Sequence, residues 1–243
     1  AANEAGVAIR VGVNEGSVVE RADALRRAAE RARPLGALMV EKLAEYLDVF
    51  EEAGFENLVL AAKSHDAYTC VAVNRLIAQR WDYPLHLGVT HAGLPGAAAI
   101  RSAAAIGALL CEGIGETIRL SYAGDPVQEV RAGVELLCCL RLRERRGVEL
   151  IACPTCGRLQ MDLAPKVDEI RRALADVDAP LTVALMGCVV NGPGEAESAD
   201  VAICAGRGKA ILYRKGRRVR TVGTEEIVDA VVGEVRRLAS ERG

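Results

Sequence analysis

The chain has 243 residues, of which 51% are hydrophobic and 26% are charged, so it can bury one sizeable core or two smaller ones. Its formal net charge of -2 and its pI of about 6.0 give no positive field that would attract a nucleic acid. No apolar run approaches the roughly 18 residues that a membrane span needs, and the first residues do not resemble a signal peptide. We therefore expect a globular cytoplasmic protein that binds neither nucleic acid nor membrane.

The first half of the chain alternates short β-rich runs with longer helical patterns, which is typical of βα units on a parallel sheet. The predicted strands are nearly all apolar, as strands covered on both faces should be: Ala8–Val13, Asn57–Ala61, Pro84–Thr90 and Thr117–Tyr122. The predicted helices are Ala22–Arg33, Leu38–Ala53, Tyr68–Arg80, Ala97–Glu112 and Val127–Arg145. Polar residues follow the strands, where parallel α/β folds place their ligand sites.

Four βα units are too few to close an eight-stranded barrel, and the chain begins at Ala1 rather than at an initiator Met. We therefore expect residues 1–146 to be the C-terminal half of a (β/α)8 TIM-like barrel whose N-terminal part is missing. An open four-stranded sheet is the alternative.

The pattern changes near Arg146 and Gly147, and a second, smaller α/β domain is predicted over residues 147–243. Its predicted strands are Val148–Ala152, Leu181–Met186, Val201–Ala205, Ala210–Arg214 and Arg217–Val222, and its predicted helices are Leu163–Ala175 and Glu225–Glu241. Lys215 and Gly216 are expected to form the hairpin turn between the last two strands.

The eight cysteines fall into two groups, and a chain with this much apolar sequence does not need disulfides. Five lie in apolar or helical segments, where we expect them to serve as small core residues: Cys70, Cys111, Cys138, Cys139 and Cys204. Cys153, Cys156 and Cys188 lie instead in Gly/Pro-rich turns, in the sequences CPTCGR and GCVVNGPGE. Three thiolates with glycine and proline around them suit an iron–sulfur cluster that has one iron not held by cysteine. A structural zinc site and a redox dithiol at Cys153 and Cys156 are the alternatives.

These two motifs, with Glu195 seven residues after Cys188, resemble the cluster domain of the 4-hydroxy-3-methylbut-2-enyl diphosphate synthase family. The resemblance implies a 4Fe-4S cluster held by Cys153, Cys156, Cys188 and Glu195. A carboxylate binds iron more loosely than a thiolate does, so the resemblance also implies that Glu195 can give way to the substrate. The second domain is accordingly expected to have the iron–sulfur fold of ferredoxin and sulfite reductase.

The first domain resembles the same family over strands five to eight of its barrel, in the segments Ile9–Asn14, Leu60–Ser64, Pro84–Thr90 and Gly113–Ser121. The resemblance implies that Arg10, Asn14 and Lys63 bind the substrate's diphosphate, and two phosphoryl groups do require fixed cations and donors. Arg119 and Ser121 are further candidates for substrate binding. The alternatives are ion pairs inside the barrel for Arg10 and Arg119, and turn capping for Asn14 and Ser121.

Two histidines lie in or just after the segment that resembles strand seven of the family barrel, and they are interpreted differently. His86 lies in the middle of an apolar run, so we expect it to be packed or hydrogen-bonded rather than catalytic. His91 stands where the family has the glutamate of a Thr-Glu-Ala-Gly sequence. An imidazole can still act as a general acid near neutral pH, so His91 is a candidate catalytic residue beside Glu195, and altered activity is the alternative.

The resemblance implies a two-electron reductive ring opening in non-mevalonate isoprenoid synthesis. The cyclodiphosphate of methylerythritol becomes hydroxymethylbutenyl diphosphate, in the bacterial cytoplasm or a plastid, and this chain alone is expected to be inactive. Further implications are a head-to-tail homodimer and ferredoxin or flavodoxin as electron donor. A basic run on the C-terminal hairpin could dock such a donor or simply be solvated: Arg214, Lys215, Arg217, Arg218 and Arg220. The rival functions are a non-catalytic iron–sulfur carrier, a zinc-stabilised binding module and an unrelated phosphate-binding barrel enzyme.

Overall fold

The computed structural model describes residues 1–18, 35–154, 156–188 and 192–242. The chain forms two compact units, Ala1–Arg143 and Glu144–Gly243. The helix predicted over residues 22–33 lies outside the described residues.

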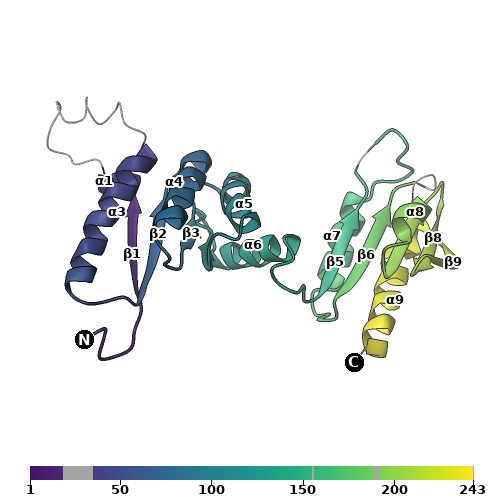
Figure 1. Cartoon of the computed structure of the whole chain (residues 1–243). Helices are drawn as coiled ribbons and strands as arrows, with labels where there is room; N and C mark the ends of the chain where they lie inside the picture. The colour runs from purple at the N-terminus through teal and green to yellow at the C-terminus, as the bar shows by residue number, and fades with distance from the viewer. Residues whose placement is uncertain (19–34, 155, 189–191, 243) are drawn as a thin grey trace. The chain divides into compact units, whose positions relative to one another are not determined.

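The first unit is built on four parallel strands, β1 (Ile9–Asn14), β2 (Leu58–Lys63), β3 (His86–Gly88) and β4 (Thr117–Arg119). β1 pairs with β2, and β3 pairs with β4. An isolated bridge between Leu60 and Leu85 joins β2 to the start of β3, which gives the order β1-β2-β3-β4. The strands β1, β2 and β3 are labelled in Figure 1. The parallel βα pattern is therefore confirmed, and the described strands do not close into a barrel. β3 and β4 are shorter than predicted.

The helices of the first unit are α1 (Glu15–Val18), α3 (Leu35–Glu52), α4 (Ala67–Arg80), α5 (Pro95–Cys111) and α6 (Pro126–Cys139). Their apolar residues, including Met39 and Val73, share one core with strand residues such as Val11 and Leu60. Alternate residues of β1 take opposite faces of the sheet, so Val11 is buried whereas Arg10 is exposed. Helix packing thus covers one face of the sheet and leaves the face that carries Arg10 for polar groups.

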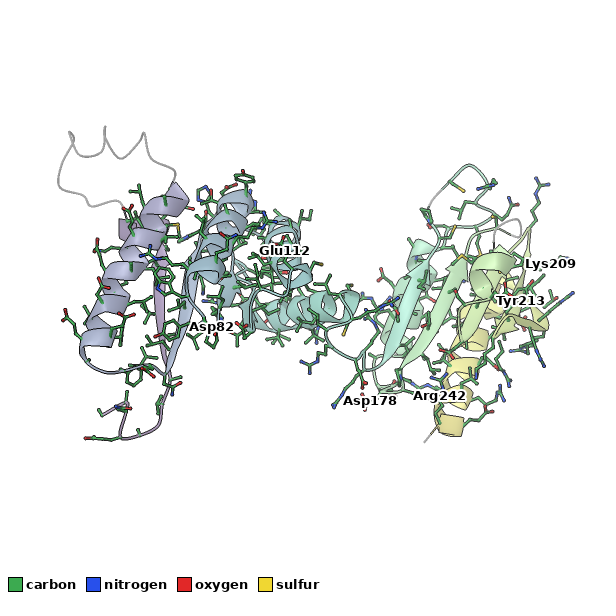
Figure 2. The ribbon with its side chains drawn as sticks, viewed as in Figure 1. Asp82, Glu112, Asp178, Lys209, Tyr213 and Arg242 are labelled. Atoms are coloured by element: carbon green, nitrogen blue, oxygen red, sulfur yellow. The ribbon has the colours of Figure 1, made fainter. Side chains whose placement is uncertain are left out.

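Specific polar contacts hold the ends of these helices. The side chain of Asp66 accepts the N–H of Thr69 at 2.7 Å and caps the start of α4. Arg75 of α4 donates to Glu112, which is labelled in Figure 2 at the end of α5, with Nε 2.9 Å from Oε2. These contacts fix two neighbouring helices on the same side of the sheet.

The prediction that the last helix of this unit continues to Arg145 is wrong, because α6 ends at Cys139. Arg141 has a φ of 57°, the left-handed conformation that commonly follows a helix. The N–H of Arg141 bonds to the carbonyl of Cys138, and that of Leu142 bonds to the carbonyl of Leu137, which is a Schellman ending. The sequence hides this ending because arginine takes the place where glycine is usual.

The second unit contains a five-stranded sheet in the order β5-β6-β7-β8-β9 (Figure 1). β5 (Val148–Ala152), β6 (Leu181–Met186) and β7 (Val201–Ala205) are parallel, and their predicted bounds are confirmed. β8 (Lys209–Arg214) and β9 (Arg217–Gly223) continue the sheet as an antiparallel hairpin, as predicted. The other elements are α7 (Ala164–Ala173), α8 (Gly192–Ala196), the 3-10 helix η1 (Thr224–Glu226) and α9 (Ile227–Arg242).

The two faces of this sheet carry different cores. Large aliphatic residues such as Leu185 and Ile203 pack with α7 and α9 on one face. The other face is lined by small residues, including Ala184, Ala202 and Cys204, and it packs with α8. Figure 2 shows Asp178 and Arg242 at one end of this unit, where Arg242 donates to the carbonyl of Pro180 at 2.8 Å, beside the start of β6. Among the described residues, none of the helices combines the length and the hydropathy of a membrane span.

Candidate functional site

A group of cations lies on the face of the first sheet that the helices leave uncovered. The register of β1 and β2 sets Asn14 beside Lys63, and that of β3 and β4 sets Gly88 beside Arg119. Cε of Lys63 lies 3.5 Å from where a Cβ on Gly88 would be, so the Lys63 side chain extends over β3 toward β4. Small residues at this crossing therefore leave room for long cationic side chains.

The three cations Arg10, Lys63 and Arg119 lie close enough together to act on one another. Burial lowers the pKa of Lys63, and the positive charges of Arg10 and Arg119 lower it further. Within the described residues, none of Arg10, Lys63 and Arg119 has an ion-pair partner, so the predicted alternative of internal ion pairs finds no support. We call these three residues the cationic face. Three cations without a carboxylate suit a polyanionic ligand.

His86 lies among these cations and is buried. Its Nδ1 is 2.9 Å from Oγ1 of Thr117 on the neighbouring strand, and its Nε2 is buried without a hydrogen-bond partner in the described structure. Burial, followed by the charges of Lys63, Arg10 and Arg119, lowers the pKa of His86 to about 4. The imidazole is therefore neutral at physiological pH, and the prediction of a packed, hydrogen-bonded histidine is confirmed.

A second polar cluster lies where β1 and β2 end, among the polar residues that follow the strands, although none of its members was predicted to bind the substrate. Glu15 accepts hydrogen bonds from the hydroxyl of Ser64 and, at 3.0 Å, from the backbone N–H of His65. Its other oxygen is 2.8 Å from Nδ1 of His65. Burial alone would raise the pKa of Glu15, but these hydrogen bonds and the charge of His65 hold it below its usual value. The sequence signal for this cluster was that its residues directly follow two neighbouring strands.

The remaining candidates of the first unit follow β3 and β4. His91 is exposed, has a φ of 53°, and has its Nδ1 3.1 Å from Oγ1 of Thr90. Ser121 is half-buried two residues after β4. A hydrogen bond of 3.0 Å from Ala123 N–H to the carbonyl of Gly93 links the two loops. These residues therefore lie at the carboxyl edge of the sheet, as do Asn14 and Lys63.

In the second unit, two turns bring the motif cysteines to the carboxyl edge of β5 and β6. The N–H of Cys153 bonds to the carbonyl of Leu185 at 2.9 Å, and that of Gln160 bonds to the carbonyl of Gly187 at 2.9 Å. A Cβ on Gly187 would lie 2.2 Å from Cδ1 of Leu159, so a larger residue there would displace the Leu159 side chain that packs between these turns. Backbone hydrogen bonds thus join the two turns both at the start of the CPTCGR motif and just after its end.

The thiols of these turns differ in environment. Cys156 is exposed, and hydrogen bonds from the backbone and side chain of Arg158 lower its pKa, although the nearby Cys188 raises it. Cys188 is 6% exposed and Cys153 is half-buried. Among the described residues, no three potential ligands meet in one metal-binding group. The side chain of Glu195 lies outside the described structure.

The other cysteines divide by burial. Cys70 and Cys204 are buried, as predicted, and burial raises the pKa of each thiol to about 11. The prediction of a core position is wrong for Cys111 and Cys139, which lie at exposed positions in the last turns of α5 and α6. Cys138 is half-buried. Cys204 lies near Cys188, whose charge would raise the pKa of Cys204 further.

Two family models match the chain. Residues 1–134 match the GcpE TIM-barrel domain, and residues 149–237 match the GcpE protein C-terminal domain. The chain belongs to the GcpE family. Relatives named 4-hydroxy-3-methylbut-2-en-1-yl diphosphate synthase (flavodoxin) include those of Geobacter sulfurreducens and Symbiobacterium thermophilum, at 46% and 45% identity over 100% and 99% of the chain. The relative from Salinispora arenicola is 43% identical over the whole chain.

The resemblance inferred from the sequence motifs is therefore confirmed at the level of the family. The chain spans 67%, 64% and 61% of the lengths of these three relatives.

Proposed function

We propose that the chain is part of a 4-hydroxy-3-methylbut-2-enyl diphosphate synthase, which opens the ring of methylerythritol cyclodiphosphate by two-electron reduction with loss of water. The observation that carries this proposal is the convergence of Arg10, Lys63 and Arg119 on one face of a parallel sheet without a carboxylate. A ligand with two phosphoryl groups would neutralise that charge.

In this proposal the first unit is the C-terminal half of the barrel and binds the diphosphate. Lys63 extends over Gly88 to a phosphoryl group, and the arginines approach from the strands on either side. Asn14 and Ser121, at the carboxyl edge, supply neutral hydrogen bonds. His91, exposed at the same edge, is placed to hand a proton to the leaving hydroxyl in place of the family glutamate.

The second unit is proposed to bind a 4Fe-4S cluster through Cys153, Cys156, Cys188 and Glu195. The donor set fits, because two turns joined by backbone hydrogen bonds present thiols at one edge and Cys188 lies close enough to Cys156 to act on the pKa of Cys156. Arg158 stabilises the thiolate form of Cys156, which is the form that binds iron. When bound, the cluster would pass on two electrons, one at a time from the external donor, and would supply a Lewis-acidic iron.

The name of the relatives supports flavodoxin as the electron donor, with ferredoxin as the other acidic carrier. We further propose a head-to-tail homodimer in the cytoplasm of a bacterium or in a plastid. Because the chain spans about two thirds of its relatives, we expect no turnover from the chain alone.

Anaerobic purification with iron, sulfide and zinc analysis tests the cluster. We expect about four irons and four sulfides per chain, with a visible absorption band, and the loss of both in Cys188→Ala. Cys111→Ser is the matched control, because Cys111 is an exposed cysteine outside the motif. Zinc in place of iron, or no metal after reconstitution, would contradict the redox function and favour a zinc-stabilised or purely structural module.

A further inference from the structure

His86 has one ring nitrogen in use and one without a partner. Nδ1 is fixed by Thr117 at 2.9 Å, which orients the ring within the sheet. His86 is only 6% exposed, and its Nε2 is inaccessible to solvent and has no hydrogen-bond partner in the described structure. A buried polar nitrogen left unpaired destabilises the fold, so such an atom indicates an ordered water or a ligand.

The charges around the ring bear on whether Nε2 binds a water or a ligand. Arg10 of β1, Lys63 of β2 and Arg119 of β4 all act on His86 with positive charge, and burial acts in the same direction. Two titratable groups of neighbouring segments are engaged elsewhere, since the Cys70 thiol of α4 donates to the carbonyl of Gly88 and the carboxylate of Glu116 accepts the N–H of Leu85 at 2.5 Å, and neither of them acts on the charge of His86. No acidic group among the described residues therefore offsets the cations around the ring.

We propose that His86 is a further binding residue of this anion site, whose Nε2 contacts a bound diphosphate group and which takes up a proton from solvent when that group binds. The inference rests on the proposed function, because it requires a phosphoryl group on the cationic face. A diphosphate cancels the positive charges that keep the ring neutral and adds negative charge beside it. The protonated ring then donates from both nitrogens, to Oγ1 of Thr117 and to a phosphoryl oxygen.

Binding would consequently depend on pH. In the free chain the pKa of His86 is about 4, and a bound polyanion raises it. At any pH between the free and bound values, binding takes up a proton, so affinity increases as the pH falls through that interval. His86 would thus add charge to the site only when a ligand is present.

The test uses inorganic pyrophosphate as the probe and the whole chain as the protein. The chain has three histidines, His65, His86 and His91, so their imidazole nitrogens can be resolved by 15N NMR. We expect pyrophosphate to move the His86 nitrogens from neutral to imidazolium shifts near pH 6. Calorimetry in buffers of different ionisation enthalpy measures the protons taken up. Pyrophosphate also titrates, so the informative quantity is the difference between wild type and variant.

Two substitutions separate the roles of the two nitrogens. His86→Asn keeps a polar group near Thr117 and removes Nε2, and we expect it to weaken pyrophosphate binding roughly tenfold. His86→Gln can reach the Nε2 position with an amide N–H, and we expect a weakening of about threefold or less. Both should abolish the extra proton uptake. His65→Gln is the control, because His65 binds Glu15 outside the cationic face, and it should leave the uptake unchanged.

The outcomes are distinguishable. Pyrophosphate binding that depends on Lys63, tested with Lys63→Met, but leaves the His86 signals and proton uptake unchanged would overturn the inference while the anion site stands. In that case an ordered water satisfies Nε2. Absence of pyrophosphate binding to both wild type and Lys63→Met would overturn the inference together with the proposed phosphate site. Urea unfolding followed by the fluorescence of Trp81 verifies that each variant is folded.

Discussion

Replacing Gly88 with alanine tests how closely the cationic face is packed. The new Cβ would lie 2.8 Å from the carbonyl oxygen of Arg119, a contact too short for a real Cβ, and 3.5 Å from Cε of Lys63. β3 and β4 must therefore move apart. Overpacking of this kind costs about 1–3 kcal/mol, and the alanine offsets about 0.4–1 kcal/mol by restricting the unfolded chain. We expect Gly88→Ala to lower the free energy of unfolding of the first unit by about 1–2 kcal/mol and to weaken pyrophosphate binding, since moving β4 away from β3 shifts Arg119 relative to Lys63.

Trp81, the single tryptophan of the chain, packs against the core of the first unit and reports its unfolding in urea. With a denaturant dependence of about 2 kcal/mol per molar urea, the midpoint should fall by about 0.5–1 M. Gly107→Ala in α5 is the matched control, because its Cβ would make an ordinary contact of 3.7 Å with Cδ1 of Leu136 and alanine favours a helix. A Gly88→Ala variant with wild-type midpoint and pyrophosphate affinity would refute this account of the strand spacing.

Three further changes test local features of the first unit with the same fluorescence probe. Asp66→Ala removes the cap that binds the N–H of Thr69, so stability should fall by about 1 kcal/mol; an unchanged midpoint would contradict the capping role. Burial alone would raise the pKa of Glu15, but its hydrogen bonds hold it lower, so its contribution is complete above the unfolded pKa of about 4.3 and is lost as the pH falls through the folded pKa. Wild type should therefore lose more stability than Glu15→Gln between pH 5 and pH 3, and parallel pH profiles would argue against this role. Arg141→Gly relieves a positive φ of 57° and should raise stability by about 0.5–1 kcal/mol, whereas a lower midpoint would show that the arginine side chain stabilises the helix end.

The elements that sequence patterns predicted well are those determined by local apolar runs. β5, β6 and β7 have the predicted bounds because each is a short apolar run between turns. α6 shows the limit of such patterns, since its end depends on a left-handed Arg141 that composition does not mark. β3 and β4 are shorter than their apolar runs, because hydrogen-bonded pairing rather than hydrophobicity sets the length of a strand.

The sequence predicted which residues belong to the candidate site, but it did not predict which of them are in contact. Lys63 and Arg10 could be singled out through the family resemblance of their strands, but their proximity to Arg119 depends on pairing across more than fifty residues. The contact between Glu15 and His65 likewise joins residues fifty positions apart. The pKa of His86 is lowered by burial and by cations on three different strands, so no single segment of sequence could predict this shift.

The strand register also decides which charges of the second unit an electron donor could use. Cys204 pairs with Met186 beside the cysteine turn, so the carboxyl edge of β7 is the edge of the proposed cluster. Arg214 pairs with Val201 at the other end of β7, and it is bound there by the buried Glu234. At about 3.4 Å per residue, the hairpin turn after Arg214 lies about 17 Å along β8 from Lys209, roughly two Debye lengths at physiological salt. The charges at the hairpin turn therefore suit solvation, whereas Lys209, labelled in Figure 2, is exposed at the edge where β7 ends.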